Sequence, residues 1–101
     1  MMFWVSSPVV STSSIGKYMN VAKPSPTHAG NPELVALGLR IRLLRQNLGF
    51  SQEAFADEIG IDRSYVGGIE RGEHNFSMIN LLKISQALKI PASKLLDEAG
   101  L

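Results

Sequence analysis

Enzymatic or metal chemistry requires a nucleophile with its base, a pair of carboxylates, or several metal ligands on converging elements. The 101-residue sequence has no cysteine and only two histidines. His28 stands among prolines, and His74 stands in a short polar stretch, so we expect both imidazoles to be exposed and neither to bind a metal. Because no catalytic set can be assembled, the sequence predicts a protein that is not an enzyme and uses no metal and no cofactor.

The residues from 51 to 72 have the spacing of two short helices. Ser51 and Asp62 both suit an N-cap, because a short side chain can accept a hydrogen bond from an amide of the first helical turn. The expected helices cover residues 52–59 and 63–71, and Gly60 ends the first in a backbone conformation that is cheap for glycine. Two such helices with a tight turn are typical of a helix-turn-helix unit, whose second helix lies in the major groove of DNA.

Three further helices are expected to support this unit. In residues 33–48, apolar side chains recur at steps of three and four and predict one amphipathic helix; they are Leu34, Leu37, Ile41, Leu44 and Leu48. Ser77 caps a fourth helix, whose expected inward residues are Leu81, Leu82, Ser85 and Leu88. A fifth follows Pro91 and carries Leu95 and Leu96. The predicted fold is therefore a compact all-α domain of five helices, over residues 33–101.

Composition limits what surrounds this domain. Residues 1–32 are rich in Ser, Thr, Pro and Gly and show no useful periodicity, so they predict a flexible, disordered arm. The apolar stretch at residues 3–10 is interrupted and too short for a membrane span or a signal peptide. The absence of cysteine suits a reducing cytosol, and we expect a cytoplasmic, nucleoid-associated protein without a membrane partner.

Charge alone does not point to nucleic acid. The net charge is +1, and from residue 33 onward eight Lys and Arg face nine Asp and Glu, a balance of −1. The case for a DNA partner must therefore depend on where individual charges lie. Lys17 and Lys23 are the only charges in the arm, and they allow either a passive arm or one that follows the minor groove.

The string SQEAFADEIGIDRSYVGGIERG resembles the Cro and lambda-repressor-like, or Xre-type, helix-turn-helix family, which includes the controller proteins of restriction-modification systems. The resemblance extends over about residues 33–101. It combines a basic first helix, the Ser51-Gln52-Glu53 start, Ala56 with Gly60, and a closing Ile-Glu-Arg-Gly. It implies a dimeric transcription regulator, repressor or controller protein, that binds a palindromic operator in double-stranded DNA.

The resemblance also implies roles for single residues. The positions that face the bases are Arg63, Ser64, Gly67 and Gly68, and of these only arginine can bond guanine with two hydrogen bonds. The expected phosphate contacts are Gln52, Tyr65, Arg71, Asn75 and Ser77. Alternatives are that Tyr65 only covers the edge of the core and that the loop after residue 71 is simply solvated. Arg45 and Glu70 match a structural ion pair of the family.

Assembly and partners are expected from the C-terminal segment. Its apolar residues exceed what a short helix can bury alone and predict a homodimer interface; they are Ile90, Leu95, Leu96 and Leu101. The alternative is that all four pack inside one domain. A second function also remains open, because a helix-turn-helix domain can serve as a protein-interaction module such as an antitoxin or an adaptor subunit. RNA polymerase or another protein is then a possible partner, and the weak net charge and the two adjacent glycines favour this alternative.

Overall fold

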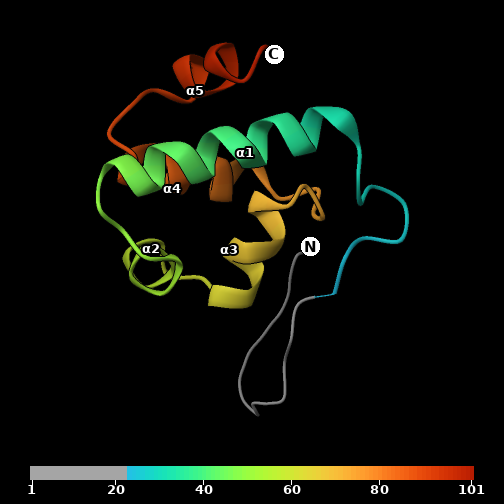
Figure 1. Cartoon of the computed structure of the whole chain (residues 1–101), viewed down its shortest axis with the longest axis horizontal. Helices are drawn as coiled ribbons and strands as arrows, with labels where there is room; N and C mark the ends of the chain where they lie inside the picture. Colours follow the sequence, from blue (N-terminus) through green and yellow to red (C-terminus); the bar gives the residue numbers. More distant parts are fainter. Residues whose placement is uncertain (1–22) are drawn as a thin grey trace.

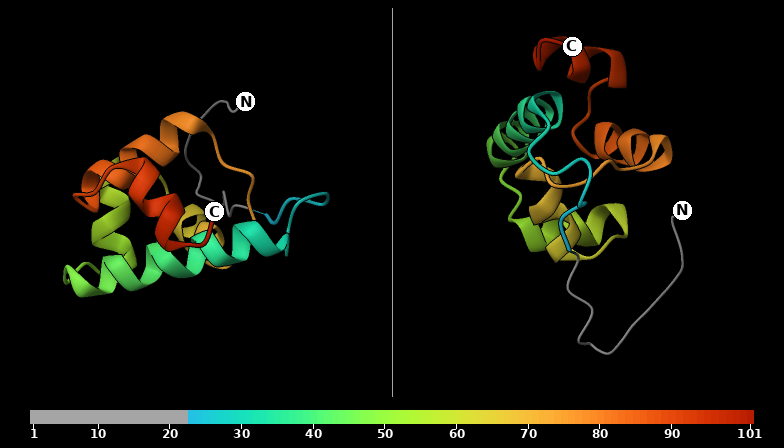
Figure 2. Two further views of the ribbon diagram at one scale, coloured as in Figure 1. Left: turned by 90° about the horizontal axis from the view of Figure 1, so that it is seen from above. Right: turned by 90° about the vertical axis from the view of Figure 1, so that its right-hand side faces the viewer.

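The computed structural model describes residues 23–101, and within them the chain forms five α-helices and no strand. These are α1 (Pro32–Asn47), α2 (Gln52–Ile59), α3 (Arg63–Glu70), α4 (Met78–Ala87) and α5 (Ala92–Glu98). Helix α5 lies on one side of α1, and α2 and α3 lie on the other (Figures 1 and 2). The prediction of an all-α domain with five helices is confirmed. None of the helices in this part of the chain combines the length and the apolar character needed to cross a membrane.

Local signals set the ends of the helices. The Ser51 hydroxyl accepts a hydrogen bond from the Ala54 amide at 3.0 Å, and the Ser77 hydroxyl accepts one from the Asn80 amide at 3.1 Å. Gly60 ends α2 with φ at 75°, a conformation that glycine adopts without a Cβ penalty. Asp62 departs from the prediction, because it occupies the N-cap position of α3 without a cap bond and accepts a hydrogen bond from the Ser64 hydroxyl.

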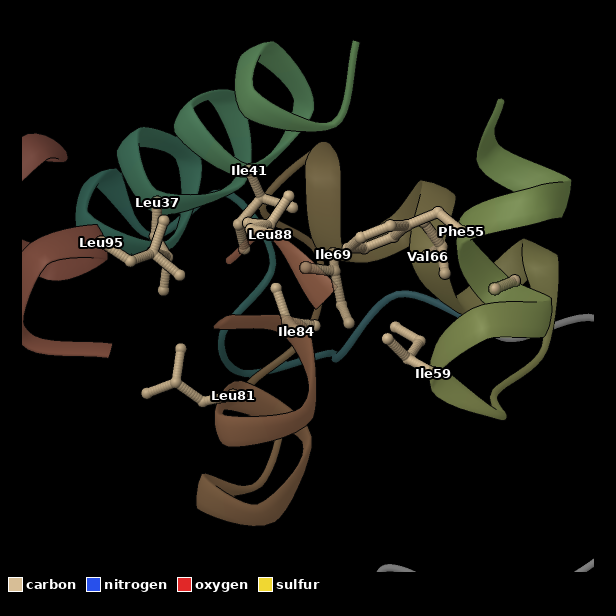
Figure 3. Close-up of a cluster of buried hydrophobic side chains, with 11 residues drawn as sticks. Leu37, Ile41, Phe55, Ile59, Val66, Ile69, Leu81, Ile84, Leu88 and Leu95 are labelled. Carbon is tan, nitrogen blue, oxygen red and sulfur yellow. The ribbon is translucent and has the colours of Figure 1, made fainter. Parts of the chain in front are cut away.

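All five helices contribute to one hydrophobic core (Figure 3). Its most buried members include Ile41 of α1, Phe55 of α2, Ile69 of α3 and Ile84 of α4. Of the inward residues predicted for α4, Leu81, Ser85 and Leu88 are buried, but Leu82 is 43% exposed. Ile84, which was not predicted, is buried instead. The buried residues Leu81, Ile84 and Ser85 are separated by three and four positions and therefore share the inward side of α4. Leu82 lies beside that inward side and is exposed.

The C-terminal helix corrects the predicted dimer interface. Leu95 is completely buried within one chain and touches the core, so it offers no surface to a second copy. The prediction that Leu95 lies in a dimer interface is therefore wrong, because α5 folds back against α1 with this side chain inward (Figure 3). Ile90 and Leu96 are partly buried against the same core, and Leu101 remains 53% exposed.

The segment before α1 is attached to the domain. The Ser25 amide donates to the Glu73 carbonyl at 2.9 Å, and the Gly30 amide donates to the Gly72 carbonyl at 3.0 Å. The Asn31 side chain then caps α1 by accepting from the Glu33 amide at 2.9 Å. Residues 23–31 thus differ from the free arm that the sequence predicts, and the remainder of that arm, with Lys17, lies outside the described residues.

Candidate nucleic-acid interface

The outward face of α3 is the surface that the helix-turn-helix arrangement presents. Arg63, Gly67 and Arg71 follow one another at steps of four residues, and Ser64 lies on the same side of the helix. Arg63 and Arg71 are exposed, and Ser64 is half-buried. The opposite side of α3 carries the buried Val66 and Ile69. The helix therefore has one side in the core and one side available to a ligand.

The two glycines of α3 have different surroundings. A Cβ on Gly67 would lie 3.0 Å from Nη1 of Arg71 and 3.7 Å from Oε1 of Gln52, so Gly67 lies beneath the exposed polar side chains. A Cβ on Gly68 would lie 2.2 Å from Nε2 of His74. Gly68 therefore makes room for a buried ring, and we remove it from the predicted base-reading set.

His74 is a further residue that sequence reasoning placed wrongly. It was expected to be exposed, but only 7% of its surface is accessible, and its ring stacks on Tyr65 with centroids 4.5 Å apart and planes 16° from parallel. Its Nε2 atom is buried without a hydrogen-bond partner. Gly68 was the signal in the sequence that could have indicated the burial of His74, because a glycine inside a helix often marks the close approach of a neighbouring group. His28, by contrast, is exposed as predicted.

Acidification is expected to destabilise the fold through His74. Burial lowers the pKa of its imidazole, while Glu73 raises it and Arg71 lowers it by smaller amounts. The unfolded chain therefore takes up the proton at higher pH, so the free energy of unfolding should hold above about pH 6.5 and fall below it. Urea unfolding from about pH 5 to pH 7.5 measures the slope. His74→Gln should reduce this slope and His28→Gln, the exposed control, should not; equal slopes in wild type and His74→Gln would contradict the assignment.

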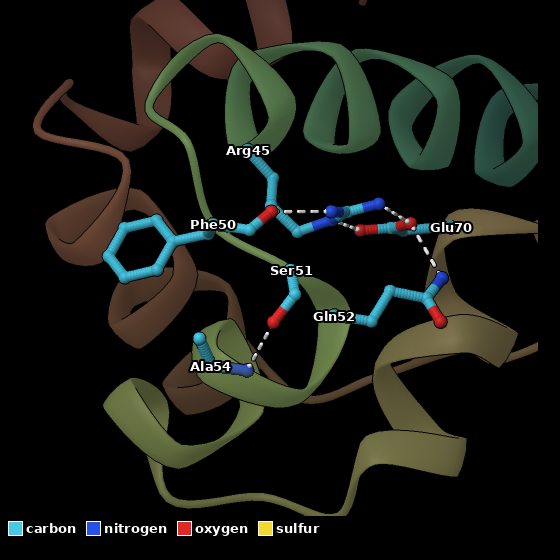
Figure 4. A network of polar contacts seen from close by, with 6 residues as sticks. All are labelled: Arg45, Phe50, Ser51, Gln52, Ala54 and Glu70. Atoms are coloured by element: carbon cyan, nitrogen blue, oxygen red, sulfur yellow. Dashed lines mark hydrogen bonds and ion pairs between the residues drawn. The ribbon is translucent and has the colours of Figure 1, made fainter.

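A buried polar network anchors α3 to the two preceding helices (Figure 4). Arg45 of α1 donates from Nε to Oε2 of Glu70 at 2.6 Å and from Nη2 to Oε1 at 3.0 Å. It also donates from Nη1 to the Phe50 carbonyl at 2.7 Å. Gln52 of α2 donates from Nε2 to Oε1 of Glu70 at 3.0 Å. The pair Arg45–Glu70 is thus present, and it determines how α2 and α3 lie against α1.

Gly38 allows α1 to approach α3 closely enough for this network. A Cβ at this position would lie 2.3 Å from the Ile69 carbonyl oxygen and 2.7 Å from that of Glu70. Backbone atoms cannot move aside as a flexible side chain can, so any larger residue would separate the helices. Sequence reasoning did not single out Gly38, because nothing in the local pattern of α1 distinguishes it from a tolerated helix glycine.

The loop after α3 contains the other predicted contacts. Arg71 forms an exposed ion pair with Glu73, with Nε 2.9 Å from Oε2 and Nη2 3.2 Å from Oε1. This hydrogen bond raises the pKa of Arg71 and lowers that of Glu73. Asn75 is exposed, and Ser77 caps α4. Of the predicted phosphate contacts, Arg71 and Asn75 lie on this loop beside the Glu73 carboxylate. Gln52 and Ser77 lie at the starts of α2 and α4, and Tyr65 lies within α3.

Within residues 23–101, no cluster of three or more His, Cys, Asp or Glu residues could hold a metal ion. The polar groups on and beside the outward face of α3 are the Gln52 amide, the Arg63 and Arg71 guanidiniums and the Ser64 hydroxyl, all of which can form hydrogen bonds with a ligand. Fold and site together define a helix-turn-helix binding domain of the kind that reads double-stranded DNA.

Comparison with known proteins establishes the family. The sequence model of the family described as "Helix-turn-helix" matches residues 41–95, more than half of the chain. The chain belongs to this family in its Xre-type, Cro and lambda-repressor-like form, a family of DNA-binding transcription regulators that are not enzymes.

Two relatives show the extent of the similarity. A "hypothetical transcription factor" of Neisseria meningitidis is 42% identical over 60 residues, which are 59% of this chain and 57% of that protein. The chain thus spans little more than half of that relative. The control protein C.MunI of Mycoplasma sp is 40% identical over 65 residues, 63% of this chain and 88% of the relative.

Two solved structures are similar as well. The restriction-modification controller protein C.AhdI of Aeromonas hydrophila is 51% identical, with a TM-score of 0.61 over 62% of this chain and 96% of that one. The Bacillus subtilis regulator SinR, solved in complex with DNA, is 35% identical, with a TM-score of 0.57 over 60% of this chain and 98% of that one. The predicted resemblance to controller proteins is confirmed.

Proposed function

We propose that the protein is a sequence-specific regulator that binds double-stranded DNA as a homodimer on a palindromic operator, in the manner of a controller protein. The observation that carries the proposal is the outward face of α3. Arg63 is exposed at the start of this helix, where a recognition helix contacts base edges. The network of Arg45, Glu70 and Gln52 holds the helix rigidly behind it. The similar regulator SinR has been solved with DNA, which supports this ligand.

The phosphate contacts are proposed around the same face. Gln52 begins α2 and Ser77 caps α4, so free amides and the positive ends of two helices accompany them. Asn75 lies exposed in the loop between α3 and α4, and Tyr65 is half-buried at the side of α3. Such contacts fix the register of a protein on the duplex but carry no sequence information. We therefore assign base reading to Arg63 and Ser64.

Replacement of Arg63 should separate base reading from backbone contact. Arg63→Ala should weaken binding to the preferred site by about 1–3 kcal/mol and reduce the preference at one base pair of each half-site. Gln52→Ala should weaken binding to all duplexes by similar factors, since it removes a positioning contact. Titration of the preferred duplex and of its single-base variants measures both effects. An equal loss on every duplex for Arg63→Ala would remove this residue from the reading set.

A dimer is proposed because one module of this size contacts few base pairs. Two copies related by a two-fold axis would place their α3 helices about 34–36 Å apart, one turn of DNA. After the correction at Leu95, the proposed interface consists of Ile90, Leu96 and the exposed Leu101. Leu96 lies in α5, and Ile90 and Leu101 lie just before and just after this helix. Helix α5 is on the side of α1 away from α2 and α3, so pairing through α5 would leave the DNA-binding face open (Figure 1).

The test is selection of binding sites from a random duplex library by the full chain, followed by titration at several salt concentrations. Enrichment of a palindrome, bound far better than random DNA, would support the proposal, in which the site of action is the nucleoid in the cytoplasm. Failure to enrich any site would favour the protein-interaction module instead. Met78 and Ile79, exposed by 66% and 61% at the start of α4, are the apolar surface that such a partner would use.

A further inference from the structure

Arg71 is an exposed cation at the C-terminal end of the outward face of α3. It follows Gly67 by four residues, and its side chain returns along the helix until Nη1 lies 3.0 Å from the place of a Cβ on Gly67. Long side chains on helices turn back over the preceding turn in this way. A residue with a side chain at position 67 would occupy this space, so the glycine leaves the guanidinium lying on the helix surface.

Glu73 determines which edge of this guanidinium is available. Its two carboxylate oxygens accept from Nε and from one hydrogen of Nη2, at 2.9 Å and 3.2 Å. The adjacent edge, formed by Nη1 and the second hydrogen of Nη2, makes no hydrogen bond with any other residue of the described chain. A guanidinium is planar, so a carboxylate on one edge fixes the direction of the other.

The pairing argues against a simple phosphate contact. A cation that attracts phosphate acts through its charge, and a carboxylate at hydrogen-bonding distance offsets this charge and repels the DNA backbone. A neutral base is read through hydrogen bonds and not through net charge, and guanine presents two acceptors, O6 and N7, that suit two parallel N–H donors. The free edge of Arg71 has these donors. The side chain of Arg71 is 60% exposed, so the edge is accessible to a ligand.

We propose that Arg71 is a second base-reading residue, which donates to guanine in the major groove, and that Glu73 is its positioning residue. The inference rests on the proposed function. It changes the predicted role of Arg71 from phosphate contact to sequence reading, and it gives Gly67 a role as the surface over which the guanidinium lies. Together with Arg63, two arginines on one helix face then read each half-site.

The experiment uses the full chain, the preferred duplex from the random library, and every single-base-pair variant of that duplex. Arg71→Lys keeps the charge but loses the two-pronged edge, and should reduce discrimination at one G·C pair of each half-site by about tenfold. Glu73→Gln should reduce discrimination at the same pair several-fold, while affinity for random duplex stays equal or rises because a negative charge is lost. Glu58→Gln makes the same charge change at an exposed position of α2 and is the matched control.

The variant Gly67→Ala separates base reading by Arg71 from a contribution to stability. The new methyl group should displace the guanidinium and reduce discrimination at the same G·C pair, although alanine in place of glycine favours the helix and should keep or raise the melting temperature. Unchanged base preferences in Arg71→Lys and Glu73→Gln, or equal losses on all duplexes, would overturn the inference and leave Arg71 a backbone contact. If the wild type itself prefers no duplex, both the inference and the proposed function fail.

Discussion

Replacement of Glu70 by alanine should lower the free energy of unfolding by about 3–5 kcal/mol. The carboxylate accepts hydrogen bonds from both Arg45 and Gln52, and the side chains of the pair are only 7% and 2% exposed. Alanine would leave the Arg45 guanidinium buried with the Phe50 carbonyl as its remaining partner. A buried charge without its counter-ion is among the most costly defects in a folded protein. Because small domains have only about 5–15 kcal/mol of stability, this single change would remove a large part of it.

Urea unfolding of wild type and Glu70→Ala at neutral pH measures this loss of stability. Two further variants test whether the unpaired buried charge causes it. Glu98→Ala removes the exposed partner of Lys94, whose nitrogen is 3.6 Å away, and should cost no more than about 0.5 kcal/mol. The double variant Arg45→Met with Glu70→Leu should regain much of the loss, since apolar side chains remove the unpaired charge. A loss below about 1 kcal/mol for Glu70→Ala would show that the network contributes little to the fold.

Truncation of Leu95 to alanine should cost about 2–5 kcal/mol of stability in each protomer. This side chain is completely buried and joins α5 to the core. Its removal loses the transfer energy of its methyl groups and leaves a cavity that neighbouring helices fill only in part. Without it, α5 would lose its main attachment to α1. The effect belongs to one chain, so it should not depend on protein concentration.

Denaturation at two protein concentrations, together with the molecular mass in solution, checks this prediction. Leu101→Ala is the matched control, because it removes the same atoms from a side chain that is 53% exposed. It should scarcely change unfolding of the protomer and should weaken the proposed dimer. If Leu95→Ala instead altered only the association of two chains, Leu95 would belong to an interface and the correction made above would be withdrawn.

The local elements of this fold could be predicted because their signals are local. Ser51 and Ser77 cap helices from their own side chains, and Gly60 ends α2 through its own backbone freedom, so neighbours distant in sequence are not needed. The spacing of Leu37 and Ile41 likewise marks the inward side of α1. These signals, with the sequence of α2 and α3, were sufficient for the five-helix fold and the family.

Side-chain surroundings could not be predicted in the same way. Leu82 and Ile84 are both apolar and differ by two positions, so only the packing of α4 shows which of them is inward. His74 looks like a polar loop residue until α3 presents the gap at Gly68 beside it. Leu95 fits an interface or a core equally well in sequence, and its complete burial follows from the return of α5 to α1.

The sequence by itself determined the helices, the turn between α2 and α3, the family, and Arg63 as the first candidate for base reading. Each of these depends on interactions within a few residues or on a motif contiguous in the chain. Only the tertiary structure decided that Gly38 brings α1 against α3, that His74 is buried, and that Glu73 directs Arg71 across Gly67. The physical reason is that burial and the direction of a side chain depend on atoms brought together from separate elements, whose positions no local pattern contains.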